Sequence, residues 1–189
     1  KFMNGCHYYN EVFLTDVKIP AKNLIGEENK GWAVTRGAMN AERSGMQFLT
    51  GLQRDLEDLV EFCNTEKVGG KPLSADPIVR HKLADISCDL EAARALAYRI
   101  IWMQDAGVAG AMEASACKVF TGELAIHLSY LGNELLGPYG QVKYSKWAPL
   151  RGYYEATYQT SFAMSISAGS NEIQRNLIAW EGLGLPRMR

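Results

Sequence analysis

Ala168-Gly-Ser-Asn-Glu-Ile-Gln-Arg175, followed downstream by Gly182-Leu-Gly-Leu-Pro-Arg187, is the stretch that decides the fold of this chain. A helix is predicted to begin after Ser170. Glu172 then falls in the first turn of that helix, where a carboxylate is favourable because a helix N-terminus carries partial positive charge. A further helix is predicted just before this stretch, over residues 149–165.

Apolar residues recur every three or four positions over three longer segments, which is the spacing of one buried helix face. The first segment covers residues 31–65, with a break expected near Gly37, and the others cover 77–107 and 110–135. Asp76 is predicted to cap the second of them, with a proline at the first helical position. The side chains expected to face the core are Leu49, Leu52, Leu56, Leu59 and Cys63, then Val79, Leu83, Ile86, Leu90, Ala93, Ala97 and Ile100, and finally Ala116, Phe120, Leu124, Leu128, Leu131 and Leu135.

Long helices joined by short connections favour an up-and-down bundle. We therefore predict an all-α fold, an up-and-down four-helix bundle with a fifth helix at the C-terminus. A short strand remnant is expected at the N-terminus. There Val12, Leu14 and Val17 lie in a β-favouring run that Pro20 ends.

Composition limits the classes of function. The 189 residues are 47% hydrophobic, which is enough for a substantial core in one domain. The formal net charge is −1, and lysine and arginine are scattered among the acidic residues. Nucleic-acid binding needs a clustered basic face, so it is not expected. Membrane insertion is not expected either, because no apolar run approaches bilayer length.

The cysteines and histidines do not have the spacing of metal ligands. The four cysteines form no Cys-x-x-Cys pair, which argues against zinc ligation and redox pairs. They are predicted to be reduced and to pack as small core residues. The three histidines show no Glu-x-x-His spacing, which argues against a di-iron bundle. The residues concerned are Cys6, Cys63, Cys88, Cys117, His7, His81 and His127.

The opening stretch resembles the closing signature of the flavin-dependent acyl-CoA dehydrogenases, in which Glu-Gly-Thr-x-Gln-Ile-Gln-Arg runs into Leu-Gly-Leu-Pro-Arg. Nearly the whole chain is similar to that family. The other matching segments are Asn10–Pro20, Asn23–Gly26, Gly31-Trp32, Asp76–Asp85 and Leu135–Gly140. The resemblance implies that residues 1–27 are the remnant of a middle β-domain with its linker, and that 28–189 form the C-terminal helical-bundle domain. The chain then reads as an excised domain, inactive by itself.

Position 168 matches the family's usual catalytic glutamate, and here it is alanine. The resemblance implies that the backbone N–H of Ala168 still polarises the thioester carbonyl, because a backbone group survives exchange of its side chain. A methyl group accepts no proton, so Ala168 cannot be the base. Glu42 matches the position of the base in the isovaleryl-CoA and long-chain types, and the alternative reading of Glu42 is a surface glutamate on a helix rich in charge. Arg43 beside it is expected to orient that carboxylate, and Arg43 and Gly169 are expected to contact the substrate.

The resemblance also implies positions that bind FAD, which are Ser170, Glu172 and Gly137. Glu172 replaces the usual amide and brings a negative charge, and a purely structural role in the first helical turn stays open for it. Gly137 belongs to a loop that approaches the flavin pyrophosphate of a neighbouring subunit. There Pro138 removes a backbone donor, and Glu134 stands where a glutamine is usual. At Glu66–Gly70 the family commonly has Arg-x-x-Phe-Gly, so the arginine that meets the pyrophosphate is absent or shifted to Lys67.

The expected function is flavin-dependent α,β-dehydrogenation of an acyl-CoA, with electrons passed to an electron-transfer flavoprotein. Two alternatives stay open. The chain could be a non-catalytic structural subunit of a hetero-oligomeric acyl-CoA dehydrogenase, or a relative of the acyl-CoA oxidases. A homo- or hetero-oligomer, dimer or tetramer, is expected, in the cytoplasm.

Overall fold

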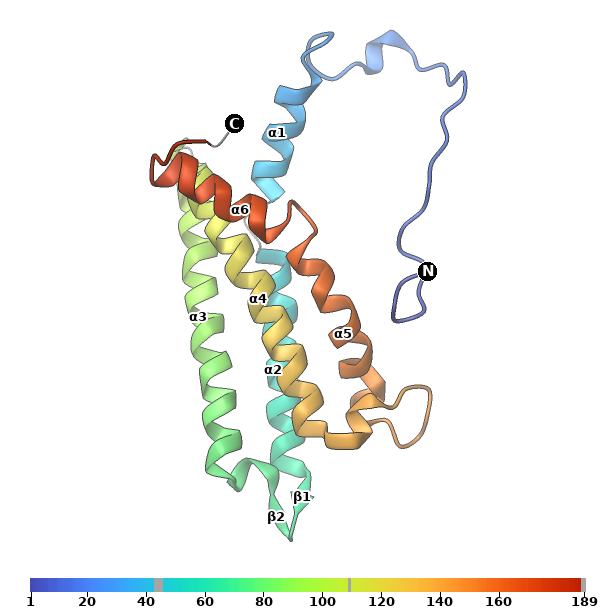
Figure 1. Ribbon diagram of the computed structural model, residues 1–189, viewed down its shortest axis with the longest axis vertical. Coiled ribbons are helices and arrows are strands. Elements are labelled where there is room, and N and C mark those ends of the chain that lie inside the picture. Colours follow the sequence, from blue (N-terminus) through green and yellow to red (C-terminus); the bar gives the residue numbers. More distant parts are fainter. Residues whose placement is uncertain (43–45, 109, 188–189) are drawn as a thin grey trace.

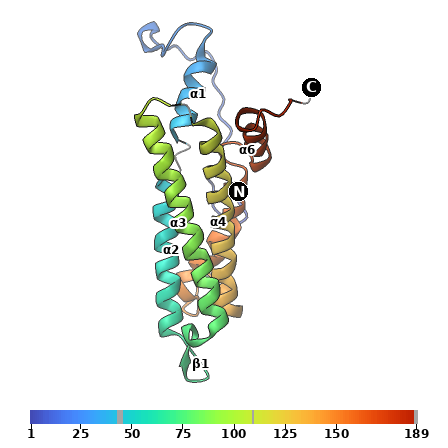
Figure 2. The same cartoon turned by 90° about the vertical axis from the view of Figure 1, so that its left-hand side faces the viewer.

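The computed structural model describes residues 1–42, 46–108 and 110–187. Its longer helices lie side by side along the molecule, and a small hairpin closes one end (Figures 1 and 2). No helix in the described part of the chain is both long enough and apolar enough to cross a membrane. The elements are α1 (Gly31–Glu42), α2 (Met46–Thr65), β1 (Lys67–Val68), β2 (Lys71–Pro72), α3 (Pro77–Asp105), α4 (Ala111–Leu136), α5 (Tyr153–Ser161) and α6 (Asn171–Leu177).

The predicted four-helix bundle is confirmed and consists of α2, α3, α4 and α5. Figure 1 shows α6 crossing one end of this bundle, with α1 standing beyond the same end, while β1 and β2 form the antiparallel hairpin at the other. We call these the α6 end and the hairpin end. The predicted fifth helix is α6, which continues into a π-helical turn at Ile178–Gly182.

Two helix boundaries differ from the prediction. The break expected near Gly37 is wrong, because α1 runs through Gly37 to Glu42. An exposed glycine costs a helix only about 1 kcal/mol, so it weakens the helix without ending it. The helix predicted over 149–165 is an α-helix only in its middle, with tighter 3-10 turns at Pro149–Gly152 and Phe162–Ser165.

The predicted core faces of α2 and α3 are confirmed. Every side chain expected to be inside on these two helices is buried, and Leu59 and Cys63 are fully so. The N-cap of α3 is confirmed too, since the Asp76 carboxylate accepts a hydrogen bond from the Ile78 N–H at 2.7 Å, with Pro77 at the first helical position. In α2 and α3, the apolar stripe in the sequence therefore coincides with the face that is buried in the core.

The prediction for α4 covers only part of its buried surface. Leu124, Leu128 and Leu131 are buried as expected, whereas Ala116, Phe120 and Leu135 are partly buried. A second face that was not predicted is buried as well. It consists of small residues, namely Ser115, Gly122, Ser129 and Gly132. This face arises because α4 contacts α2, α3, α5 and α6 and is thus the central helix of the fold.

Small side chains on α4 let α5 approach closely. A Cβ at Gly132 would lie 1.9 Å from Cδ1 of Tyr154, whose ring is 1% exposed. The Ser129 hydroxyl donates to the Ser161 hydroxyl at 3.0 Å. Tyr154 in turn donates its hydroxyl hydrogen to the Asp55 carbonyl on α2 at 2.7 Å. The tyrosine ring therefore joins α5 to α4 and α2 together.

The strand expected around residues 12–17 is wrong. Within the described residues 1–42 no strand forms, and the only regular elements are a short 3-10 turn and α1. The reason is that a strand is held by hydrogen bonds to a neighbouring strand, and no strand in the described part of the chain lies beside this segment. Its apolar side chains are exposed, for example Phe13 at 83%.

The cysteines are free, and only two pack as predicted. Cys63 and Cys117 are buried, and burial raises the pKa of the Cys63 thiol to about 11. Cys88 is exposed and Cys6 is partly exposed, so the core prediction is wrong for these two. Cys88 lies on the outer face of α3, beside the apolar stripe rather than in it.

Replacing Gly132 by alanine tests the close approach of α5 to α4. The added methyl would overlap a fully packed ring, so we expect Gly132→Ala to lower the free energy of unfolding by about 3 kcal/mol, the upper part of the range for overpacked cores. Denaturant unfolding measures this.

The matched control is Gly51→Ala on α2, where nothing lies within 4 Å of the new methyl. There the greater helix propensity of alanine should raise stability by up to about 1 kcal/mol. Equal effects at the two sites would contradict the packing.

Candidate functional site

The loop before α6 has an unusual backbone. Ala168 has φ +54° and Gly169 has φ +90°, so two successive residues adopt the left-handed region. Glycine takes this conformation without strain, but alanine has a Cβ that disfavours it. The Ala168 side chain is exposed. The surrounding structure therefore maintains the unfavourable backbone conformation at position 168.

The N-terminus of α6 begins as predicted, at Asn171 after Ser170. The Ser170 hydroxyl accepts a hydrogen bond from the Ile173 N–H at 3.4 Å, and its own hydrogen bonds the Glu172 carboxylate. The pKa of Glu172 lies below its usual value. The causes are, first, a hydrogen bond from its own backbone N–H, then one from Ser170, and the nearby charges of Arg175 and Lys118. Glu172 is thus an exposed carboxylate held in its charged form.

A polar network fixes α6 to α4. Lys118 on α4 donates to the Asn171 side-chain oxygen at 2.8 Å, and the Asn171 amide donates to Glu123 at 3.3 Å. Arg175 forms an ion pair with the same Glu123 carboxylate. Asn171 is only 4% exposed, so its amide lies inside the contact between the two helices. These bonds determine where the loop before α6 lies.

The structure places Ala168, Gly169, Ser170 and Glu172 together at the α6 end. Glu42 is the last residue of α1, and both views place that end of α1 at the same end of the bundle (Figures 1 and 2). The direction of the Glu42 side chain is not described, and Arg43 lies outside the described residues. The backbone thus carries the predicted base and the predicted carbonyl donor to one end of the molecule.

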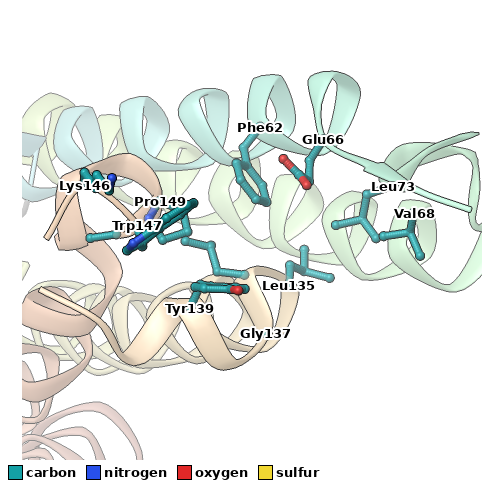
Figure 3. Close-up of a pocket in the computed structure, with 12 residues that line it drawn as sticks. Phe62, Glu66, Val68, Leu73, Leu135, Gly137, Tyr139, Lys146, Trp147 and Pro149 are labelled. Atoms are coloured by element: carbon teal, nitrogen blue, oxygen red, sulfur yellow. The ribbon is translucent and has the colours of Figure 1, made fainter. Parts of the chain in front are cut away.

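Gly137 does not join the other predicted site residues. It ends α4 with φ +62°, at the hairpin end. A pocket of about 660 Å³ lies there (Figure 3). Glu66 and Phe62 project into it from the end of α2, with Gly137 and Tyr139 on the opposite side. The residues that line it are Phe62, Glu66, Val68, Leu73, Leu135, Leu136, Gly137, Tyr139, Lys146, Trp147, Ala148 and Pro149.

The charges around this pocket do not suit a phosphate group. The Glu66 carboxylate lines it, and a carboxylate repels phosphate. The Glu134 carboxylate nearby pairs with Lys82 and so neutralises that cation. Pro138 has no N–H to offer. Lys146 is the one cation among the residues that line the pocket. The pocket at the hairpin end is thus lined by aromatic and apolar side chains, with one carboxylate and one ammonium group among them.

Sequence reasoning gave no role to Gln174, Asn171 or Lys118, which hold the loop in place. Gln174 is fully buried, and its amide donates to the Ala168 carbonyl at 3.0 Å. Asn171 and Gln174 are three residues apart, so they share one face of α6. Two large amides on the face that turns toward the bundle are a signal that could have identified them from the sequence.

A family model described as "Acyl-CoA dehydrogenase, C-terminal domain" matches residues 29–183. The chain is 33% identical over 181 residues to the acyl-CoA dehydrogenase FadE26 of Mycobacterium tuberculosis, covering 93% of this chain and 45% of that protein. It is 30% identical to the short-chain specific acyl-CoA dehydrogenase of Megasphaera elsdenii, over 87% of this chain and 42% of that protein. The chain therefore spans less than half the length of these relatives.

Among solved structures, the chain is similar to one from the ChsE4-ChsE5 complex of Mycobacterium tuberculosis. The TM-score is 0.77 at 30% sequence identity, and the match covers 93% of this chain and 46% of that one. The residues matched by the family model, 29–183, include the bundle, the loop before α6 and the hairpin end.

Glu172 should make the protein's stability depend on acid pH. Its pKa in the folded state lies below its usual value. Its contribution is therefore present above the unfolded-state pKa and is lost as the pH falls through the folded-state pKa. We expect Glu172→Gln to be less stable than wild type at pH 7 and to lose less stability on acidification. Urea unfolding from about pH 7 to pH 3 measures this, with Glu28→Gln, outside the bundle, as the control. Parallel pH profiles for wild type and Glu172→Gln would contradict the assignment.

Proposed function

Because the chain belongs to the acyl-CoA dehydrogenase family, we propose that it is the C-terminal helical part of an FAD-dependent enzyme that dehydrogenates acyl-CoA thioesters at the α,β-bond. Electron-transfer flavoprotein takes the electrons, and the protein works in the cytoplasm as an oligomer. Under the proposal, residues 28–189 form the C-terminal helical-bundle domain of this enzyme, and residues 1–27 are the remnant of its middle β-domain with the linker. Alone it is inactive.

The single observation that carries this proposal is that α1 ends, at Glu42, by the same end of the bundle as the loop that bears Ala168. The α-proton of a thioester is weakly acidic, so its removal requires a base and donors at the carbonyl oxygen. Under the proposal the Ala168 N–H is one donor, and Glu42 takes the proton. Arg43 orients the Glu42 carboxylate, and Gly169 lines the thioester.

A flavin suits the α6 end. Ser170 and Glu172 lie together at the start of α6, and under the proposal the Ser170 hydroxyl exchanges its hydrogen bond to Glu172 for one to the flavin. Glu172 adds a charged acceptor at the same helix end. These residues would hold FAD here. The hydride that leaves the β-carbon requires an acceptor, which is the chemistry that FAD supplies when it is bound.

A second candidate function is a structural subunit in a mixed assembly with another acyl-CoA dehydrogenase chain. It is favoured by the pocket at the hairpin end, where Glu66 and Gly137 face each other and the donors expected for a neighbour's flavin pyrophosphate are missing. Under this proposal the hairpin end completes no flavin site on an adjacent subunit, and the partner chain supplies those contacts.

Glu42→Gln tests the base directly in the complete flavoprotein that carries this chain. We expect anaerobic flavin bleaching by a panel of acyl-CoAs in the wild type, and a fall of about 10²-fold or more in its rate in the variant, as for a lost general base. Equal rates would remove Glu42 from the mechanism. A wild-type protein that purifies without flavin and never bleaches would favour the structural-subunit function instead.

Moving the base back to position 168 is a second test. In a Glu42→Gln background, Ala168→Glu should recover bleaching by about tenfold or more, because the exposed side chain at 168 has room to grow and its backbone N–H is unchanged. Ser167→Glu, also exposed and one residue away, is the matched control and should recover nothing. Recovery by both, or by neither, would count against a site in which the two positions serve one α-carbon.

A further inference from the structure

Gln174 joins the helical body of α6 to the loop in front of it. Its side chain is fully buried. From there the amide reaches back across the start of the helix and donates to the Ala168 carbonyl at 3.0 Å. The hydrogen bond is partly buried and so partly shielded from water, and it therefore restricts the loop more strongly than a fully exposed one would.

The amide also lies directly against Gly169. A Cβ at Gly169 would come within 2.5 Å of the Gln174 Nε2. Gly169 is therefore glycine for two reasons, its left-handed φ of +90° and the side chain pressed against it. Gln174 thus holds both residues of the strained pair, Ala168 through its carbonyl and Gly169 through contact.

The other end of the same amide makes no compensating bond. The Gln174 Oε1 is buried and accepts no hydrogen bond from any residue that the structure describes. A buried acceptor without a partner is unfavourable, and an apolar side chain of similar shape would remove that cost. The amide is therefore useful here only through the bond that its Nε2 donates to Ala168.

Gln174 itself cannot move with the loop, because α6 is fixed to α4. Asn171, one turn earlier on the same face, is held between Lys118 and Glu123. Arg175, the next residue, pairs with Glu123. A rigid helix thus carries the donor that holds the carbonyl of a strained residue.

We propose that Gln174 is a positioning residue that sets the direction of the Ala168 N–H. Holding the Ala168 carbonyl and its left-handed φ fixes the two dihedral angles around its Cα, and with them the adjoining peptide N–H. This inference rests on the proposed function, in which that N–H polarises the thioester carbonyl. Small displacements of such a donor weaken its effect on the developing charge.

The test measures the carbonyl itself. The probe is the acyl-CoA that bleaches wild type fastest, labelled with ¹³C at the thioester carbonyl and bound to the complete flavoprotein in the Glu42→Gln background, where turnover is slow. Hydrogen bonding lowers the carbonyl stretching frequency in the infrared difference spectrum. Adding Gln174→Glu, whose charged form presents only acceptor oxygens to the Ala168 carbonyl, should return the frequency toward that of free acyl-CoA. Gln174→Met, which has no donor in any protonation state, should do the same. The single-turnover bleaching rate of Gln174→Glu in the wild-type background should fall by about tenfold or more with little change in KM.

Asn133→Asp is the matched control. Asn133 is a partly buried amide that, like Gln174, donates to backbone carbonyl groups, here those of Ser129 and Tyr154, but it lies far from the loop along α4. It should reduce thermal stability without moving the carbonyl band. Gln174→Met repeats the test if the glutamate variant does not fold.

An unchanged band in both Gln174 variants would overturn the inference, as would equal shifts in Gln174→Glu and Asn133→Asp. A band that is not lowered in the parent would show that the Ala168 N–H is not the donor, which contradicts the proposed function at this position and the inference with it. Rapid bleaching by the Glu42→Gln parent would contradict only the proposed base.

Discussion

The contact between Tyr154 and the small-residue face of α4 is the constraint on which the remaining structure depends. The ring fits only because position 132 has no Cβ, and its hydroxyl reaches across to the Asp55 carbonyl on α2. Further along, a Cβ at Gly122 would lie 3.0 Å from the Met164 carbonyl, so the turn after α5 is close to α4 as well. The depth at which α5 packs therefore sets where the loop at 166–170 emerges.

A second set of contacts, which are polar rather than apolar, holds the loop at 166–170 and α6 in place. The Lys118, Asn171 and Glu123 bonds fix α6 on α4, and Gln174 holds the loop from inside. Buried polar groups are favourable only when they are bonded in a defined geometry, so they specify one arrangement where apolar contacts would accept several. The strained backbone at Ala168 is maintained by this combination of close packing below and directed hydrogen bonds above.

Much of the fold could be predicted because α2 and α3 are each buried on one side, which leaves a clear stripe in the sequence. The helix α4 is buried on nearly all sides. Its second buried face consists of Gly122, Ser129 and Gly132, and these small residues form no apolar pattern in the sequence. The strand expected near Val12 failed for another reason, because residue propensity cannot supply a neighbouring strand. For the candidate site, the motif predicted roles for Ala168 and Ser170, but only the fold shows that Gly137 lies at the opposite end and that Gln174 bonds the loop from inside.

The proposed reaction makes two separate demands on the chain. Under the proposed function, carbonyl polarisation is a backbone property of position 168 that persists with any side chain, whereas proton removal needs a carboxylate and is assigned to α1. The most direct test is a structure of the complete flavoprotein with a bound acyl-CoA that cannot be oxidised. The account predicts a Glu42 carboxylate oxygen about 3–3.5 Å from the α-carbon, the distance of a reactive arrangement, and the Ala168 N–H on the thioester oxygen. A Glu42 side chain turned into solvent, or another carboxylate at the α-carbon, would contradict it.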